Sequence, residues 1–252
     1  MGSAGDSCAF RRVARQWLGG LLLAAAATGC ATQAPAPPSA GTGTVWGHLS
    51  LVPREGVTPH KAGGSPYADR RMKDVEFVDY SKPGFAVVHL GEGPSPGGSA
   101  QLAIRSSGVR TRLDPEHAAV GAGGMLIVSN ETGAAHVLSA PSLQLVHWLQ
   151  PGQQIEIAVP DAGEHSLFLL DVARSEAIVF VSPGPFVVVS ADGRFELSGL
   201  APGSHTLLAW HPRFPPARAP LQLAPDSVVQ LDIEMGVDQR DDVPASAPAA
   251  QP

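Results

Sequence analysis

The sequence has 252 residues with 17 basic and 23 acidic side chains, a net charge of −6, and only two cysteines. A modestly acidic chain with scattered basic residues does not have the charge pattern of a nucleic-acid-binding protein. Residues 1–29 contain three arginines and one aspartate, so the remainder carries a net charge of −8 and a single cysteine, Cys30. If residues 1–29 are removed, the mature chain has no disulfide and no thiolate within its fold to bind a metal.

The N-terminal segment has the three parts of a secretory signal. Arg11, Arg12 and Arg15 supply the positive charge, and an apolar run follows from Trp17 to Ala27. A run of about ten apolar residues is too short to cross a bilayer core as a helix. We therefore predict that residues 1–29 are a signal peptide.

The exit of this segment reads Ala27-Thr28-Gly29-Cys30 and resembles the lipobox of bacterial lipoproteins. The resemblance implies cleavage before Cys30 and diacylation of its thiol, and two acyl chains hold a protein on a bilayer. Ala31 after the cysteine favours the periplasmic face of the outer membrane. The alternative is an ordinary signal that leaves Cys30 free, although a free thiol at the start of an exported protein is unusual.

Two further segments have compositions that cannot build a core. Residues 30–43 are rich in proline and alanine and are expected to form an extended tether. Residues 237–252 are expected to be a disordered tail. About 190 residues remain between them, enough for one large or two small domains.

The remaining sequence is typical of an all-β protein. Short apolar segments are separated by Gly and Pro, and 154–159 and 229–235 alternate with period two, as half-buried strands do. Only Arg112–Val120 has room for a helical turn or two. The predicted strands are Val45–Val52, Val75–Phe77, Ala86–Leu90, Ala100–Ile104, Met125–Ser129, Gln154–Val159, Ser166–Leu170, Ala177–Ser182, Phe186–Ser190, Arg194–Leu197, His205–His211, Leu221–Leu223 and Val228–Met235.

Residues 190–211 read as two hairpins in series. Asp192-Gly193 supplies the positive φ angles of a tight turn, and Ala201-Pro202-Gly203 makes the next reversal. The segment resembles the carboxypeptidase regulatory-like module, a transthyretin-like sandwich grouped with carbohydrate-binding-like folds. The resemblance covers residues 182–236 and implies a fold rather than a function.

The order of elements before this module is similar to that of methylamine-utilisation-like proteins, in which a cupredoxin-like sandwich comes first. Asn130 and His136, six residues apart, match the start of that family's copper site. Pro151-Gly152 and Gly163 match the turns that follow it. The resemblance implies a cupredoxin-like β-sandwich over residues 44–181.

The same resemblance implies that the copper site is lost. It places the family's Cys, His and Met ligands at Leu169, Val172 and Ser175, none of which can replace them. A blue-copper site needs a thiolate and two imidazoles, and His136 alone remains. We therefore expect no cofactor and no electron transfer.

A remodelled metal site is the first alternative. A cupredoxin-like fold would place His136 and His165 near the position of the family's copper ion, with His117 and His147 as possible loop ligands. Imidazole suits Cu(II) or zinc, but no metalloprotease-type spacing supports such a site. This alternative describes a periplasmic copper-binding, metal-binding or redox-accessory protein.

No motif for a nucleophile or a phosphate-binding loop is present. Asp171 and Glu176 could form a carboxylate pair, although an exposed loop between two strands explains them more simply. We therefore predict that the protein is not an enzyme.

A carbohydrate-binding module is the second alternative. Trp148 could stack on a sugar, and Phe214 is expected in an exposed rim loop. Trp210 alternates with Leu208 and is expected in the core. The sequence as a whole predicts a non-enzymatic, lipid-anchored envelope protein with a binding or structural role. Its expected partners are the membrane, through the lipid on Cys30, and an envelope protein or a glycan.

Overall fold

The computed structural model describes residues 38–56 and 78–238. The predicted signal, Cys30, most of the tether, the strand Val75–Phe77 and most of the tail lie outside these residues. The described residues belong to one compact unit. Strands make up nearly all of its regular structure, so the all-β prediction is confirmed. No helix among the described residues is long and apolar enough to cross a membrane.

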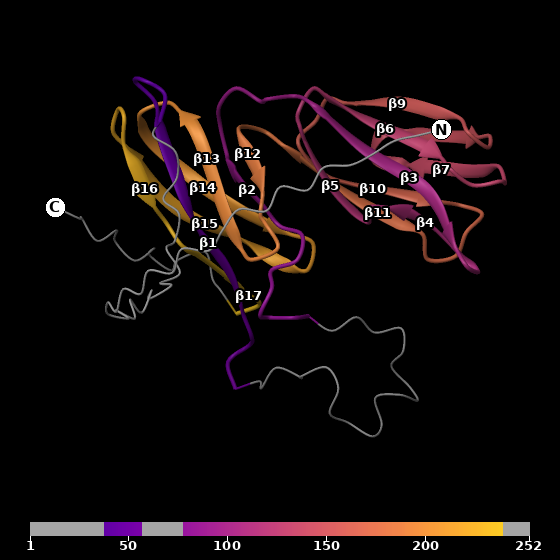
Figure 1. The fold of residues 1–252 in the computed structure, drawn as a ribbon, viewed down its shortest axis with the longest axis horizontal. Coiled ribbons are helices and arrows are strands. Elements are labelled where there is room, and N and C mark those ends of the chain that lie inside the picture. Colours follow the sequence, from indigo (N-terminus) through magenta and orange to yellow (C-terminus); the bar gives the residue numbers. More distant parts are fainter. Residues whose placement is uncertain (1–37, 57–77, 239–252) are drawn as a thin grey trace, which may run out of the picture. The chain divides into compact units, whose positions relative to one another are not determined.

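Four sheets form two sandwiches, each with its own apolar core (Figure 1). We name the first the inserted sandwich, because its strands follow one another without interruption between β2 and β12. One of its sheets has the order β4-β3-β6-β9 and the other β5-β11-β10-β7-β8. Its strands are β3 (Ser99–Ser107), β4 (Arg110–Asp114), β5 (His117–Gly121), β6 (Gly124–Asn130), β7 (His136–Ala140), β8 (Leu145–Leu149), β9 (Gln154–Val159), β10 (Gly163–Leu169) and β11 (Glu176–Ser182), with a 3-10 turn η1 (Pro141–Leu143).

The composite sandwich is built from strands on both sides of the inserted one in the sequence. One sheet has the order β13-β1-β16, with β17 also paired to β1, and the other has the order β12-β2-β14-β15. Its strands are β1 (Gly43–Val52), β2 (Val87–Leu90), β12 (Phe186–Val188), β13 (Arg194–Leu200), β14 (Gly203–His211), β15 (Phe214–Leu223), β16 (Val228–Gln230) and β17 (Ile233–Gly236).

This nesting differs from the expected order of a domain over 44–181 followed by one over 182–236. β1 pairs antiparallel with β13 and parallel with β16 and β17, and β2 lies between β12 and β14. The strand patterns of 45–52 and 86–90 predict strands correctly but do not identify their partners. The C-terminal module therefore takes two interior strands from the N-terminal side of the sequence.

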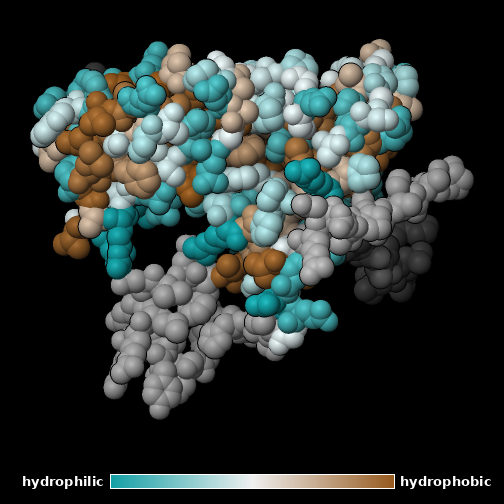
Figure 2. Space-filling view, turned by 180° about the vertical axis from the view of Figure 1, so that it is seen from behind, coloured by the Kyte–Doolittle hydropathy of each residue, from teal (hydrophilic) through white to brown (hydrophobic). Residues whose placement is uncertain are grey.

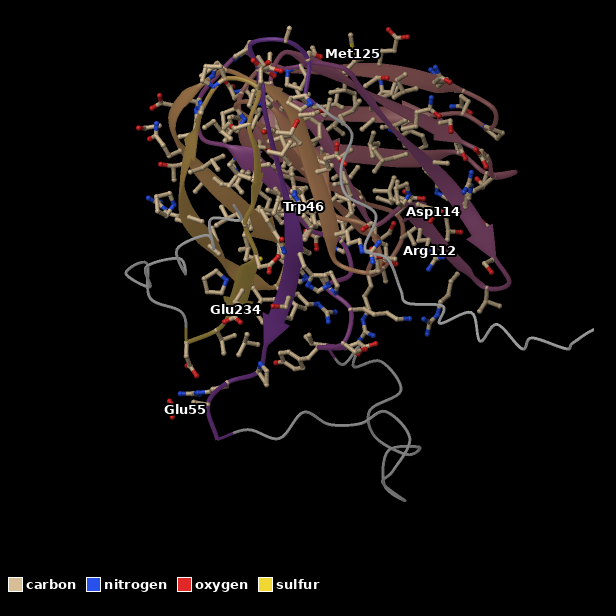
Figure 3. All side chains as sticks on the ribbon, turned by 60° about the vertical axis from the view of Figure 1, so that its left-hand side comes forward. Trp46, Glu55, Arg112, Asp114, Met125 and Glu234 are labelled. Atoms are coloured by element: carbon tan, nitrogen blue, oxygen red, sulfur yellow. The ribbon has the colours of Figure 1, made fainter. Side chains whose placement is uncertain are left out.

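The predicted strand 228–235 forms two separate strands, β16 and β17, which pair with opposite ends of β1. β16 pairs with Thr44–Trp46, whereas β17 pairs with Leu49–Val52. Between them Leu231 donates its N–H to the Trp46 carbonyl at 2.9 Å, and Asp232 accepts the His48 N–H at 2.8 Å. Figure 3 labels Trp46 on β1 and Glu234 on β17.

One other expectation was wrong, and two strands of the inserted sandwich were missed. Residues 112–120 form no helical turn, because the segment is occupied by β4, a short connection and β5. The strands β7 and β8 were not predicted at all.

Aromatic side chains join the two sandwiches. Phe180 on β11 stacks on Trp210 of β14 with ring centroids 4.8 Å apart, and His89 of β2 lies 5.0 Å from Phe180. Phe85 stacks on His117 of β5 at 5.6 Å. Trp210 is half-buried and lies outside both apolar cores, so the expected core position was wrong; it packs against the other sandwich instead.

Gly47 provides a test of the path that the segment between β16 and β17 takes over β1. A Cβ there would overlap the Leu231 carbonyl, which is backbone and cannot rotate away. We expect Gly47→Ala to lower the free energy of unfolding by about 1–3 kcal/mol, as overpacking does. Gly133→Ala is the matched control, because nothing lies within 4 Å of its added Cβ. Urea denaturation of both variants measures the difference, and equal stabilities would contradict the described path.

His211 provides a pH test of the composite sandwich. Burial is the main cause that lowers its pKa below the ordinary value of 6.5. Its Nε2–H donates to the Pro83 carbonyl, and its Nδ1 accepts the Arg213 N–H at 3.0 Å, so protonation would break the second bond. The folded protein therefore binds fewer protons than the unfolded chain, and stability should fall as the pH drops below about 6.5. His211→Asn should reduce this slope between pH 7.5 and 5.5, measured by denaturation. An unchanged slope would contradict the assignment.

Candidate functional site

The candidate site surrounds His136, the first residue of β7, whose ring is buried with 6% of the residue exposed. Its Nδ1 lies 2.7 Å from a carboxylate oxygen of Asp171, in the loop after β10. Because an ionised carboxylate only accepts, Nδ1 carries a proton and donates it. Its Nε2 lies 3.0 Å from the Thr132 hydroxyl oxygen.

The pairing of β7 with β10 creates this contact between residues 35 positions apart. Leu138 is opposite Leu169, so antiparallel register brings Asp171 level with His136. The other carboxylate oxygen of Asp171 accepts the Val137 N–H at 2.9 Å. Asp171 therefore fixes both the side chain and the backbone at the start of β7.

Hydrogen bonds lower the pKa of Asp171. Burial opposes the shift, but the bonds from Val137 N–H and from His136 outweigh it, so the carboxylate is ionised well below neutral pH. The hydrogen bond from His136 to Asp171 is charge-assisted, because its acceptor is an ionised carboxylate.

Asn130 holds the other side of the site. Its side-chain N–H groups donate to the Ala134 carbonyl at 2.8 Å and the Leu149 carbonyl at 3.0 Å. Its side-chain oxygen accepts from the N–H and the hydroxyl of Thr132. The loop between β6 and β7 is thus closed around His136 by bonds that use all the polar atoms of the Asn130 side chain.

The chain from Asp171 through His136 to Thr132 has the order of groups found in hydrolase triads. The hydroxyl hydrogen, however, has a closer acceptor in the Asn130 side-chain oxygen, at 2.7 Å, than in His136 Nε2, at 3.0 Å. A hydroxyl that donates to Asn130 does not give its proton to the imidazole. The arrangement therefore orients the histidine and gives no activated nucleophile.

The three positions implied for the other copper ligands lie close by but cannot bind metal. Leu169 is in the apolar core of the inserted sandwich, and Val172 packs against that core. Ser175 is 4% exposed, and its hydroxyl accepts the Leu113 N–H at 3.2 Å. A copper ion does not fit this set, because His136 Nδ1 is bound to Asp171 and the described residues contain no cysteine to supply a thiolate.

His165 does not join His136, and the expectation that the two would be neighbours was wrong. His165 lies near the start of β10 and bonds Ser142 and the Asp161 carbonyl, whereas Asp171 and His136 meet beyond the end of that strand. Six residues separate His165 from Asp171, which corresponds to about 20 Å along an extended chain. Within 38–56 and 78–238, no three His, Cys, Asp or Glu residues form a group that could hold a metal ion.

The other candidate residues are placed separately. His117 stacks on Phe85, and His147 on β8 lies 3.4 Å from the Gln153 side-chain amide. Glu176 begins β11 opposite Phe168, so it is not paired with Asp171, which bonds His136 instead.

The two aromatic candidates differ sharply in exposure. Phe214 is 7% exposed, starts β15 and packs with His211 and Tyr80, so the expected rim loop was wrong. Trp148 on β8 is 63% exposed. Val146, two residues earlier, is 65% exposed, and Leu170 is 62% exposed. Sequence reasoning missed Val146 because it did not identify β8, and it gave Leu170 only as the end of the predicted strand Ser166–Leu170.

Comparisons with known proteins assign no family. No family model matches the chain, and no curated protein matches it. Among solved structures, a purple cupredoxin from Nitrosopumilus maritimus is 18% identical over 33% of this chain and 99% of its own, with a TM-score of 0.29. A heme-copper terminal oxidase dimer structure is 12% identical over 46% of this chain and 85% of its own, with a TM-score of 0.28. At these TM-scores the fold assignment rests on the strand pairings themselves.

Asp171 provides the test of the site. Asp171→Ala removes the acceptor of His136 Nδ1–H and of Val137 N–H, and we expect a loss of about 1–3 kcal/mol in the free energy of unfolding at pH 7. Because the folded pKa of Asp171 is lowered, its contribution is complete above the ordinary value of 3.8 and is lost as the pH falls through the folded value.

Urea denaturation at pH 7 and pH 3 should therefore give a smaller difference between wild type and variant at the lower pH. Glu156→Ala, at an exposed position of β9, is the control and should change stability by less than about 0.5 kcal/mol. A neutral effect of Asp171→Ala at pH 7 would refute the role given to this carboxylate.

Proposed function

We propose that the protein is a non-enzymatic component of the bacterial envelope, anchored by a lipid on Cys30, whose two sandwiches serve as a binding or structural scaffold. The observation that carries this proposal is the His136 site. The one matching copper-ligand residue has been turned into a bonding partner of Asp171 and Thr132. A buried imidazole whose Nδ1–H is bound to Asp171 supports a structural role, and the described residues group no set of metal ligands around it.

The position of β1 supports a close connection between the anchor and the scaffold. β1 begins at Gly43, 13 residues after Cys30. An extended segment of that length reaches about 40 Å at ~3.1 Å per residue. Because β1 is an interior strand of the composite sandwich, force on the tether acts on a strand with neighbours on both sides.

A binding role is supported by the exposed apolar side chains Val146, Trp148 and Leu170 on the inserted sandwich. Large exposed tryptophans are enriched at protein interfaces and are costly elsewhere. The same indole could stack on a sugar, so a glycan is the second candidate partner. Phe214 is not proposed for either role, because it is buried.

The anchor is tested by Cys30→Ser in a bacterial host supplied with labelled palmitate. We expect the wild-type chain to be labelled and to sediment with membranes, and the variant to be unlabelled and to lose its membrane fraction. Cys8→Ser is the matched control and should behave as wild type, because Cys8 lies within the predicted signal. Equal labelling of both variants would reject lipidation at Cys30.

A further inference from the structure

The free edge of β8 is unusual among the described edge strands of five or more residues, whereas the uncharged edge strands β12 and β16 have only three residues each. β8 ends the sheet β5-β11-β10-β7-β8, and its sequence Leu-Val-His-Trp-Leu contains no Asp, Glu, Lys, Arg or proline. Sheet edges are normally protected by charges, prolines or a covering segment, since an open edge pairs with other strands.

The other long edge strands in the described part of the chain have such protection. Figure 3 shows Arg112 and Asp114 on the edge strand β4. β9 has Glu156, and β13 has Arg194 and Glu196. The edge strand β15 contains prolines, and β5 is met by Gly97, whose carbonyl accepts the Gly121 N–H.

The backbone of β8 presents its hydrogen-bonding groups at two defined positions. Val137, opposite Trp148, uses its N–H and carbonyl on the other side of β7, towards Asp171 and Leu170. Trp148 is therefore in a non-hydrogen-bonded pair, and its own N–H and carbonyl point to the free side. Val146, two residues earlier, is oriented in the same way.

The side chains at this edge match a second copy of the same strand. Val146 and Trp148 lie on the outer face of the sheet and are 65% and 63% exposed. Leu170 follows β10 next to Val137 and extends the apolar surface inward from the edge. Figure 2 shows apolar surface gathered on the part of the view that the inserted sandwich occupies.

We propose that β8 pairs antiparallel with β8 of a second copy of this chain about a two-fold axis at His147. Val146 of each copy then lies opposite Trp148 of the other, a pairing of a β-branched and an aromatic residue that stabilises sheets. Both pairs are hydrogen-bonded, so the outward N–H and carbonyl groups of both copies are all used. No charged side chain of β8 opposes its copy, although the chain as a whole is acidic.

The area involved makes this a weak dimer. Trp148 and Val146 offer roughly 200–300 Å² per copy, compared with about 800 Å² per partner in a standard interface. A dimer of this size needs a high local concentration, which chains anchored on one bilayer provide. In this respect the inference rests on the lipid anchor proposed above.

Cysteine cross-linking tests the register directly. In the proposed dimer, His147 faces His147 of the other copy in a non-hydrogen-bonded pair, with Cα atoms about 4.5 Å apart, within the range of a disulfide. We expect full-length His147→Cys in isolated membranes to form a disulfide-linked dimer on treatment with copper phenanthroline. The wild-type chain, with Cys8 and Cys30, gives the background, and Thr111→Cys on the protected edge β4 is the matched control.

Adding Val146→Glu or Trp148→Glu to His147→Cys should remove the dimer band, and circular dichroism of each variant checks that it remains folded. The inference is overturned if membrane-bound His147→Cys gives no band above the wild-type background, or if Thr111→Cys gives an equal one. If the lipid anchor fails but the dimer is correct, the band appears only in concentrated soluble protein. If the anchor is correct and the dimer is not, the protein sediments with membranes and no band forms.

Discussion

The fold depends on the position of β1 inside a sheet whose other strands come from the far end of the chain. β1 pairs along its length with β13 on one side and with β16 and β17 on the other. β16 and β17 pair with opposite ends of β1, and the segment that joins them passes over Gly47. A side chain at Gly47 would overlap the Leu231 carbonyl, so this path requires glycine. The composite sandwich thus cannot be completed until both ends of the folded region have met.

The nested arrangement separates two tasks. The composite sandwich contains β1, the first described strand after the predicted tether, and the inserted sandwich holds the His136 site and the β8 edge. Phe180 and Trp210 stack where the two sandwiches join, so the inserted one is supported by packing as well as by its connecting strands. This organisation suits a scaffold in which one sandwich is fixed and the other offers a surface.

His136 is held in the framework of the inserted sandwich from two sides. Asp171 binds its ring and the adjacent backbone, and Asn130 with Thr132 closes the loop on the other side. Leu169 extends the apolar core of the inserted sandwich next to this site. Hydrogen bonds and apolar packing therefore both stabilise the start of β7.

The sequence predicts the all-β class and most strands, because alternation and turn residues act locally. It does not predict which strands pair. The sequence therefore could not predict that β1 and β2 belong to the composite sandwich, or that His136 contacts Asp171. β8 was missed for an informative reason. Val146 and Trp148 are apolar on the exposed face, so the strand lacks the polar–apolar alternation that identifies others. The residues that hid the strand are those of the proposed interface.

The most direct measurement is the copper content of the purified protein after incubation with Cu(II) and desalting, compared between wild type and His136→Ala. We predict that wild type retains no copper beyond the amount found in His136→Ala, because the imidazole is bound to Asp171 and no set of metal ligands among the described residues surrounds it. A stoichiometric copper ion that is lost in His136→Ala would contradict the scaffold account and restore a metal-binding function.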